Sequence, residues 1–348
     1  MFSPLQIAQV SFQLKNEIGS EGKNSKTFIA RDHQLDADIV IKKIDKADIQ
    51  HRDTYFEESR RLYASAHPHV VQLHYACESD EHVFLAMPYY ANGSLKSLIS
   101  KWFLTVRDIV TLGCQIASGL HNIHSKGLIH FDLKVDNVLL SDRNEALISD
   151  FGLAMAQDAA GQASPDGIYT PITPPEALSE SDFDRSFDIY QFGLILYVMC
   201  NGGDCLNDQM DRFIAHDGSF DGETFSEAIE NGTFPERKSF LPHIPQRLRR
   251  IICRCLEVDP TDRFESALEV ANELAVIEGP SLDWRYSIDS GTRIWTRQLE
   301  GVVHVLAVDE KGKSELTKSI KGGKAKRQTL GCRPKLTDAA ITVLLGKT

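Results

Sequence analysis

The residues best suited to chemistry stand close together between positions 130 and 150. Asp132 and Asp150 supply carboxylates, Asn137 supplies an amide and Lys134 supplies an ammonium group. Phosphoryl transfer needs a carboxylate that orients the accepting hydroxyl, together with oxygen ligands for Mg²⁺ on the phosphates. Taken alone, each of these side chains would be an ordinary solvated residue of a surface turn. Their joint order and spacing instead argue for one shared site that could supply these atoms.

The spacing resembles the catalytic and metal-binding loops of protein kinases. Residues 130–137 read HFDLKVDN and residues 150–152 read DFG, against the family patterns HRDLxxxN and DFG. Phe131 departs from the pattern, because the family has arginine at that position. The resemblance implies a catalytic base at Asp132, a cation beside the transferred group at Lys134, and magnesium ligands at Asn137 and Asp150.

A lysine and a glutamate sixteen residues apart resemble the family's phosphate-anchoring pair. Lys42 ends the segment IVIK, which stands where the family has its VAIK strand, and Glu58 follows in an expected helix. The resemblance implies an ion pair that holds Lys42 at the α- and β-phosphates. Lys43 and Glu57 compete for this assignment, and we expect both on the exposed alternate faces of their strand and helix.

Two further segments resemble the parts of the family that enclose the nucleotide. Gly19 and Gly22 stand where a glycine-rich loop covers the phosphates, although the spacing needs one extra residue and a third glycine is missing. A plain hairpin turn is the alternative for this loop. The resemblance also implies an adenine pocket built from Val40, Met87, Pro88, Tyr90 and Leu139. The alternative for the segment around Pro88 is an edge strand that ends at this proline.

Three downstream motifs resemble elements that protein kinases have and small-molecule kinases usually lack. Residues 170–176 resemble the substrate-docking loop, residues 188–193 the DxWxxG element and residues 259–264 the DPxxRP element. The resemblance implies a buried ion pair between Glu176 and Arg263 that anchors the docking loop. It also favours Ser or Thr over Tyr as the acceptor, because a lysine follows two residues after Asp132.

Hydrophobic periodicity places these motifs in an α+β fold of two lobes with an added module. Strands are expected at 27–30, 38–44, 70–75, 83–87, 284–288, 293–299, 302–308 and 315–320. Helices are expected at 54–66, from 106 to an end at 126–127, and at 189–200, 248–255 and 264–274. The kinase resemblance covers residues 12–278, with a β-rich N-lobe to about residue 88 and a helical C-lobe from about 89 to 278. A small basic β-rich module is expected over 281–348.

The net charge is divided unevenly between these parts. Residues 281–348 contain 13 Lys and Arg and 7 Asp and Glu, a net +6, which leaves −17 on residues 1–280 out of the total of −11. The basic stretch from Lys318 to Arg327 predicts a docking surface for an acidic partner, with a solvated tail as the alternative. Nucleic acid is not expected as a ligand, because the body is acidic and the basic stretch lacks aromatic residues.

Localisation is predicted from features that the sequence lacks. No apolar run approaches the roughly 20 residues that cross a bilayer. The first basic residue is Lys15, so the start does not resemble a secretory signal. The seven cysteines are scattered and predict reduced thiols. We therefore expect a cytoplasmic protein without a membrane span.

Together these observations predict a protein serine/threonine kinase that uses ATP and Mg²⁺ and acts on a protein substrate. Two other interpretations remain open at this point. One is a pseudokinase that serves as a nucleotide-binding scaffold, motivated by Phe131 and the irregular glycine loop. The other is a kinase body that regulates the C-terminal interaction module. The presence of Lys42, Asp132, Asn137 and Asp150 favours the active enzyme.

Overall fold

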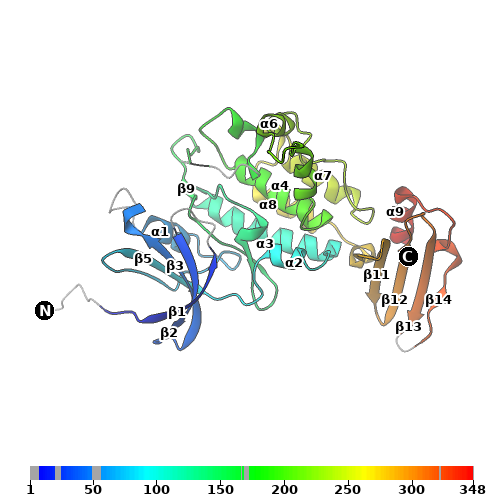
Figure 1. Cartoon of the computed structure of the whole chain (residues 1–348), viewed down its shortest axis with the longest axis horizontal. Coiled ribbons are helices and arrows are strands. Elements are labelled where there is room, and N and C mark those ends of the chain that lie inside the picture. The colour runs from blue at the N-terminus through cyan, green and yellow to red at the C-terminus, as the bar shows by residue number, and fades with distance from the viewer. Residues whose placement is uncertain are drawn as a thin grey trace.

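The computed structural model describes residues 8–19, 25–48, 56–165, 167, 172–320 and 323–347. These residues form a β-rich N-terminal lobe, a helical lobe in the middle and a second sheet at the far end of the molecule (Figure 1). The α+β fold with two lobes and an added β-rich module is therefore as the sequence predicts. Among the described residues, no helix has both the length and the apolar character needed to cross a membrane.

The N-lobe is a five-stranded antiparallel sheet with one helix. Its strands lie in the order β1-β2-β3-β5-β4, and α1 covers Glu57–Ala64. Along β3 the side chains alternate: Ile39 and Ile41 are buried in the core, whereas Val40 and Lys42 lie on the other, partly exposed face. The strands are β1 (Phe12–Gly19), β2 (Ser25–Asp32), β3 (Ala37–Asp45), β4 (Tyr75–Glu78) and β5 (His82–Pro88).

One predicted strand, over residues 70–75, is wrong. The strand in this region, β4, begins only at Tyr75. The apolar pair before it serves a different purpose: Val70 forms an isolated bridge with Ile148, and the N–H of Val71 donates to the carbonyl of Ile148 at 2.8 Å. These two valines are fully buried against the C-lobe, so their apolar character reflects contact between the lobes and not sheet formation.

The C-lobe is built around two long helices. In α3, Thr105 and Asp108 form a reciprocal capping box that fixes the first turn. In α4, every residue from Phe187 to Cys200 is buried, including the polar Asp188 and Gln191, and the almost wholly apolar run 189–200 predicts such a core helix. The helices are α2 (Leu95–Ile99), α3 (Val106–Ser125), α4 (Ser186–Asn201), α5 (Asn207–Met210), α6 (Gly222–Glu230), α7 (Gln246–Cys255) and α8 (Ala267–Ala275).

The helix expected from Phe264 begins three residues later than predicted. Ser266 is the N-cap of α8, and its side chain accepts a hydrogen bond from the N–H of Glu269. Phe264 lies before this cap and is buried in the core of the C-lobe. The apolar spacing that suggested a helix therefore starts about one turn before the helix itself.

The C-terminal module is a five-stranded antiparallel sheet with a helix on one face. The strands follow the chain in order: β10 (Arg285–Asp289), β11 (Thr292–Leu299), β12 (Val302–Val308), β13 (Ser314–Ile320) and β14 (Lys326–Arg327). The helix α9 (Asp338–Lys347) was not predicted. It packs on the sheet through Ile341, Leu344 and Leu345, and the indole N–H of Trp284 donates to the carbonyl of Leu345 at 3.1 Å.

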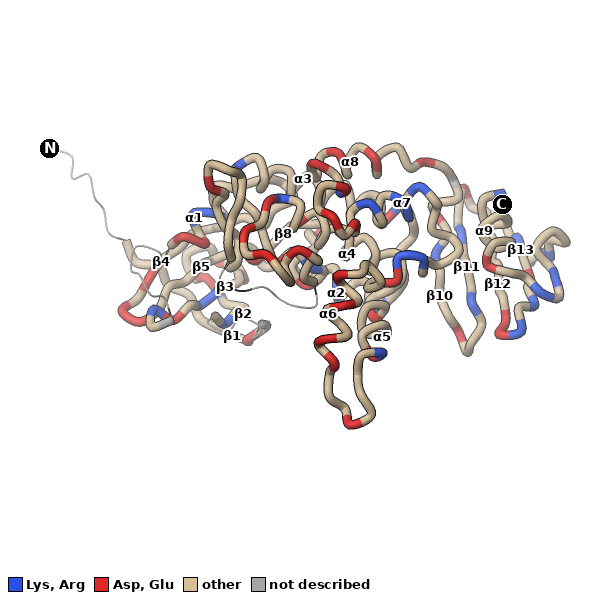
Figure 2. The backbone as a smooth tube through the Cα atoms, turned by 90° about the horizontal axis from the view of Figure 1, so that it is seen from above, with Lys and Arg blue, Asp and Glu red and all other residues tan. Residues whose placement is uncertain are grey.

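The module shares its hydrophobic core with the C-lobe. Phe103 and Leu241 of the C-lobe pack against that core. The ring of Tyr286 lies 4.8 Å from that of Phe103, and the indole N–H of Trp295 donates to Nδ1 of His243 at 3.2 Å. Acidic residues are spread over the kinase lobes, whereas the module is rich in Lys and Arg (Figure 2). The two parts therefore differ in charge but are joined by a buried apolar interface.

Candidate active site

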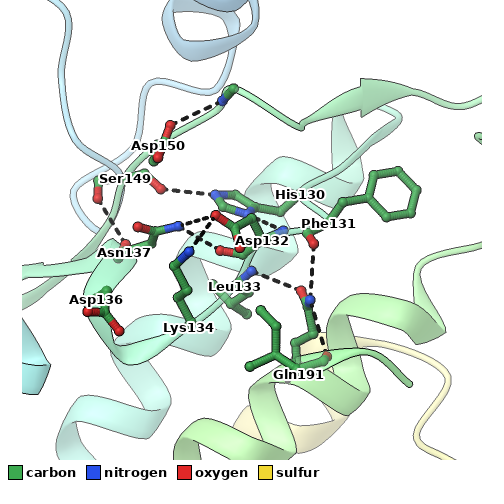
Figure 3. A network of polar contacts seen from close by, with 12 residues as sticks. His130, Phe131, Asp132, Leu133, Lys134, Asp136, Asn137, Ser149, Asp150 and Gln191 are labelled. Carbon is green, nitrogen blue, oxygen red and sulfur yellow. Dashed lines mark hydrogen bonds and ion pairs between the residues drawn. The ribbon is translucent and has the colours of Figure 1, made fainter. Parts of the chain in front are cut away.

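The loop at residues 130–137 connects β6 (Leu128–Ile129) to β7 (Val138–Leu140) and is held by helix α4 from below. The carboxylate of Asp188 accepts hydrogen bonds from the N–H groups of His130, at 2.8 Å, and Phe131, at 2.9 Å. Gln191 accepts from the N–H of Leu133 and donates to the carbonyl of Phe131 (Figure 3). These bonds hold Phe131 in the left-handed region, at a φ of 64°.

Asp132 has one oxygen held and one oxygen without a partner. The amide N–H₂ of Asn137 donates to Oδ2 and to the backbone carbonyl of Asp132, both at 2.8 Å, and Nζ of Lys134 lies 3.1 Å from Oδ2 (Figure 3). Oδ1 is buried and has no hydrogen-bond partner in the described part of the chain. Burial raises the pKa of Asp132, while the ammonium of Lys134 opposes this shift. Oδ1 of Asp132 is therefore able to accept a hydrogen bond from a bound molecule.

Lys42 joins the two lobes through two carboxylates. Its Nζ lies 2.7 Å from Oε1 of Glu58 and 2.8 Å from Oδ1 of Asp150. Burial disfavours the ammonium, but the two carboxylates outweigh that cost and raise the pKa of Lys42. The same contact lowers the pKa of Asp150 to about 2. The predicted pairing of Lys42 with Glu58 is thus present, and Glu57 instead pairs with Arg61 on the surface of α1.

Asp150 and Asn137 present oxygens that fit a divalent cation. Because the amide nitrogen of Asn137 donates to Asp132, the amide oxygen is left for another partner. The side chain of Asp150 is 45% exposed. Asp150 is the first residue of the DFG segment, and its backbone φ of 61° lies in the left-handed region. A Cβ on Gly152 would lie 3.3 Å from Oδ1 of Asp150 and 3.4 Å from Nζ of Lys42, so the chain passes close beside this ion pair.

The residues expected around adenine come from both lobes. Val40 of β3 stands opposite Met87 of β5, and Ile39 stands opposite Pro88. Val40, Met87, Pro88, Tyr90 and Leu139 are all half-buried. Gly19 is the last residue of β1 and pairs with Thr27. Gly22 lies outside the described residues.

Phe131 is buried in an aromatic cluster that the sequence reading missed. Its ring centroid lies 5.0 Å from that of Phe187 and 6.2 Å from that of Phe183, and Figure 3 shows it pointing away from the polar network. Ala163 belongs to the activation segment, residues 150–176, and exchanges two backbone hydrogen bonds with Phe183. Phe183 and Phe187, close together in the sequence, indicate an aromatic cluster, but nothing in their spacing indicates a contact with residue 131.

The predicted ion pair between Glu176 and Arg263 is present and fully buried. The guanidinium donates from Nη1 to Oε1 at 2.7 Å and from Nη2 to Oε2 at 2.6 Å. Arg263 also donates to the carbonyls of Glu257, Val258 and Ser186, and its guanidinium lies 4.9 Å from the ring of Tyr190. All the donors of this buried cation are therefore employed in fixing the docking loop on the helical lobe.

Comparison with known proteins agrees with this geometry. The family described as protein kinase domain matches residues 12–274. A probable serine/threonine-protein kinase of Clostridium acetobutylicum is 25% identical over 274 residues, which are 77% of this chain and 40% of that protein. Human mitogen-activated protein kinase kinase kinase 11 is 27% identical over 276 residues, 73% of this chain and 30% of that protein.

The human tyrosine-protein kinase Fer is 26% identical over 228 residues, 64% of this chain and 26% of that protein. This chain thus spans less than half the length of these three relatives. The match to the family covers more than half of the chain, from β1 to α8, and includes every residue of the polar network around Asp132. The chain belongs to the protein kinase family.

Proposed function

We propose that this protein is a serine/threonine kinase that transfers the γ-phosphate of ATP, bound with Mg²⁺, to a hydroxyl of a protein substrate. The observation that carries the proposal is the buried, unpartnered Oδ1 of Asp132. An orphaned buried acceptor costs folding free energy, and a ligand that donates a hydrogen bond to it recovers that cost. A substrate hydroxyl is a donor of the required kind, and Asp132 is then the base that orients it.

The cations around Asp132 have separate roles in this proposal. Lys134 lies 3.1 Å from Oδ2 of Asp132, and its proposed role is to stabilise the charge that develops on the transferred phosphoryl group. Lys42 holds the α- and β-phosphates, and its contact with Glu58 keeps the ammonium directed at the cleft. The raised pKa of Lys42 keeps its ammonium charged, so that it stabilises negative charge on the phosphates.

Asn137 and Asp150 are the proposed magnesium ligands. Oxygen-only donors, one carboxylate and one amide, suit a hard cation that is reluctant to lose its water. When bound, Mg²⁺ neutralises charge on the phosphates as the bond to the leaving oxygen breaks. The chain's own contribution is orientation, since the Asn137 amide is turned by Asp132 and the Asp150 carboxylate by Lys42.

The adenine site is proposed on the half-buried side chains of Val40, Met87 and Leu139, with backbone groups of Pro88 and Tyr90 beside the ring. Gly19 and Gly22 are proposed to cover the phosphates. A pseudokinase is less well supported, because the contacts among Lys42, Glu58 and Asp150 are complete.

We also propose domain limits and a location. The kinase domain is taken as 12–278, divided near residue 88, and the module as 281–348. The seven cysteines are all free thiols, which is usual in reducing compartments and supports a cytoplasmic protein. The acidic partner of the basic stretch from Lys318 to Arg327 remains a prediction.

The test is direct transfer to defined acceptors. Full-length protein is incubated with labelled ATP and Mg²⁺ and with three peptides that differ only in having serine, threonine or tyrosine as the acceptor. We expect label on the serine and threonine peptides and loss of at least about 100-fold in rate for Asp150→Asn. Transfer to the tyrosine peptide alone would contradict the acceptor assignment, and no transfer by folded protein that binds ATP would favour the pseudokinase.

A further inference from the structure

One end of the C-terminal module carries two rows of side chains on a single face of its sheet. Directly opposite residues of an antiparallel pair point to the same face, so the register of β11 to β14 identifies these rows. In the outer row, Val302 stands between Leu299 and Ile320. The row two residues further in consists of Arg297, His304, Lys318 and Lys326. These two rows, with Glu300 and Lys324, are called the module tip below.

The outer row of the module tip is aliphatic and uncovered. Leu299 is 42% exposed and Ile320 is 66% exposed, with Val302 partly exposed between them. The same face of the sheet is covered further in by α9, but none of the three side chains belongs to the core that this helix closes. Neighbouring exposed apolar side chains at the end of a sheet mark a surface where a partner can bind.

The inner row of the module tip concentrates positive charge. Lys318 and Lys326 are exposed and stand directly opposite each other, an arrangement in which like charges repel. Neither lysine forms an ion pair with any residue that the structure describes. Burial lowers the pKa of the neighbouring His304, and the cations Arg297 and Lys318 add to this shift. A bound anion would relieve the repulsion between the two exposed lysines.

The other charges nearby do not cancel this positive charge. Glu300 is the one carboxylate among the residues of the tip, and the exposed Lys324 adds a third ammonium group to the two lysines of the inner row. Arg297 is buried, with its guanidinium 5.1 Å from the ring of Trp284. On the opposite face of the sheet, Arg327 pairs with Glu315 at 2.9 Å. That face is uncharged at the same end, where it carries Gln298, Val303 and Ser319.

The spacing of the two rows matches the boundary layer of a lipid bilayer. A strand rises roughly 3.3 Å per residue, so the aliphatic row lies about 7 Å beyond the basic row. Proteins that bind at a bilayer surface bury their apolar groups roughly 5 to 10 Å into the boundary between headgroups and acyl chains. Lysines set back by this distance meet the lipid phosphates. An acidic protein, the partner predicted from the sequence, would account for the lysines but not for the aliphatic row.

We propose that the module tip binds the surface of an anionic lipid bilayer. The aliphatic row enters the boundary of the acyl chains, and the exposed lysines of the tip bind the phosphates of the headgroups. The contact is peripheral and needs neither ATP nor the residues around Asp132. Because the module lies at the opposite end of the molecule from the N-lobe (Figure 1), the tip is remote from the nucleotide site.

The test is sedimentation of the full-length protein with vesicles, without ATP. Vesicles of phosphatidylcholine with about one third phosphatidylserine should bind the protein at least tenfold more tightly than vesicles of phosphatidylcholine alone. The double variant Lys318→Gln, Lys326→Gln should weaken binding to the anionic vesicles at least tenfold. Its matched control is Lys311→Gln, Lys313→Gln, which removes two exposed lysines at the other end of the same sheet and should change binding less than threefold.

A second arm tests the aliphatic row. Ile320→Gln should weaken binding to the anionic vesicles at least fivefold, whereas Ile288→Gln, at a residue 58% exposed at the other end of the sheet, should change it less than twofold. Unchanged melting temperatures verify that all variants fold. No vesicle binding by the wild type, equal effects of the two lysine pairs, or normal binding by Ile320→Gln would each overturn the proposal. Binding of a glutamate-rich peptide at the tip without vesicle binding would overturn it in favour of an acidic protein.

Discussion

At the scale of single residues, Phe131 determines how the activation segment is anchored. A cation at this position could pair with a phosphate on the segment, but phenylalanine cannot. The structure instead buries the ring against Phe183 and Phe187, and Phe183 forms a two-bond bridge with Ala163 of the activation segment. Apolar contact therefore takes the place of a charge-assisted contact, and it is present without any modification.

We predict that transfer activity does not depend on a phosphate in residues 150–176. After complete phosphatase treatment, verified by mass spectrometry, the rate should stay within tenfold of the untreated enzyme. As a control, Phe131→Leu should keep most activity, whereas Phe131→Arg should lose it, because it places an unpaired cation in an apolar cluster. A fall of more than tenfold on dephosphorylation would count against this view of the segment.

At the scale of elements, the docking loop depends on one buried ion pair. The side chain of Arg263 is fully buried, and that of Glu176 is 7% exposed, so removing the cation leaves a carboxylate without compensation. Arg263→Met should lower the free energy of unfolding by about 3 to 5 kcal/mol, as measured by urea denaturation.

The matched control for this variant is Arg247→Met. Arg247 pairs with Glu273 at 3.0 Å, but both side chains are almost half exposed. An exposed pair of this kind contributes about 0 to 1 kcal/mol, so this variant should be nearly neutral. Equal losses of unfolding free energy in the two variants would show that the buried ion pair stabilises the fold no more than the exposed one.

The contact between the C-lobe and the module should respond to pH through His243. Burial lowers the pKa of this imidazole to about 4, with Arg249 adding to the effect. As the pH falls below about 6.5, the unfolded chain binds a proton that the folded chain does not, so the free energy of unfolding decreases down to about pH 4. The loss attributable to this residue is on the order of 3 kcal/mol.

This pH dependence can be isolated with His243→Gln, whose amide oxygen still accepts from the indole of Trp295. Denaturation midpoints are compared at pH 7.0 and pH 5.0 for both proteins. The wild type should lose stability between these values by clearly more than the variant does. Parallel pH profiles would mean that the imidazole does not titrate as its burial predicts.

Several elements could be predicted because the signal is local. The helix α3 has its capping residues and apolar period in one stretch, and α4 is apolar almost all round apart from Asp188 and Gln191. The ion pair of Lys42 with Glu58 and that of Arg263 with Glu176 were predicted from the resemblance to kinase motifs. In contrast, the contact of Phe131 with Phe187 and that of His243 with Trp295 join distant segments, which no local pattern reveals.

Two other discrepancies have different causes. The segment at 70–75 is apolar because it packs between the lobes, which periodicity cannot distinguish from a strand. The helix α9 combines β-branched residues with a glycine, so its propensity is weak, but Thr337 before it was a usable cap signal: its hydroxyl accepts from the N–H of Ala340. Tertiary packing decided both cases.

At the scale of the whole molecule, the C-terminal module behaves as part of the C-lobe. The sequence suggested an appended unit, but Phe103 and Leu241 belong to the module's core, and Arg107 bridges to Asp283 at 3.0 Å. Separating the parts would expose these apolar side chains to water. A groove of about 450 Å³ beside β10 is lined by both parts and exists only because they are joined in this way.

We therefore predict a single cooperative unfolding transition for the C-lobe and the module. In a Trp102→Phe background, the remaining tryptophans, Trp284 and Trp295, report on the module alone. Their fluorescence should change at the same temperature as the helical circular dichroism signal of the C-lobe. An earlier fluorescence transition with the helical signal intact would show that the module unfolds independently.

The central claim is that Asp132 acts through its free oxygen on the accepting hydroxyl. The most direct measurement compares single-turnover phosphoryl transfer by the wild type and Asp132→Asn, with ATP affinity measured on the same samples. The amide retains the shape of the carboxylate but accepts a proton poorly, so transfer should fall by at least about 100-fold while ATP affinity changes less than threefold. A folded Asp132→Asn variant that binds ATP normally and transfers phosphate at the wild-type rate would contradict the account.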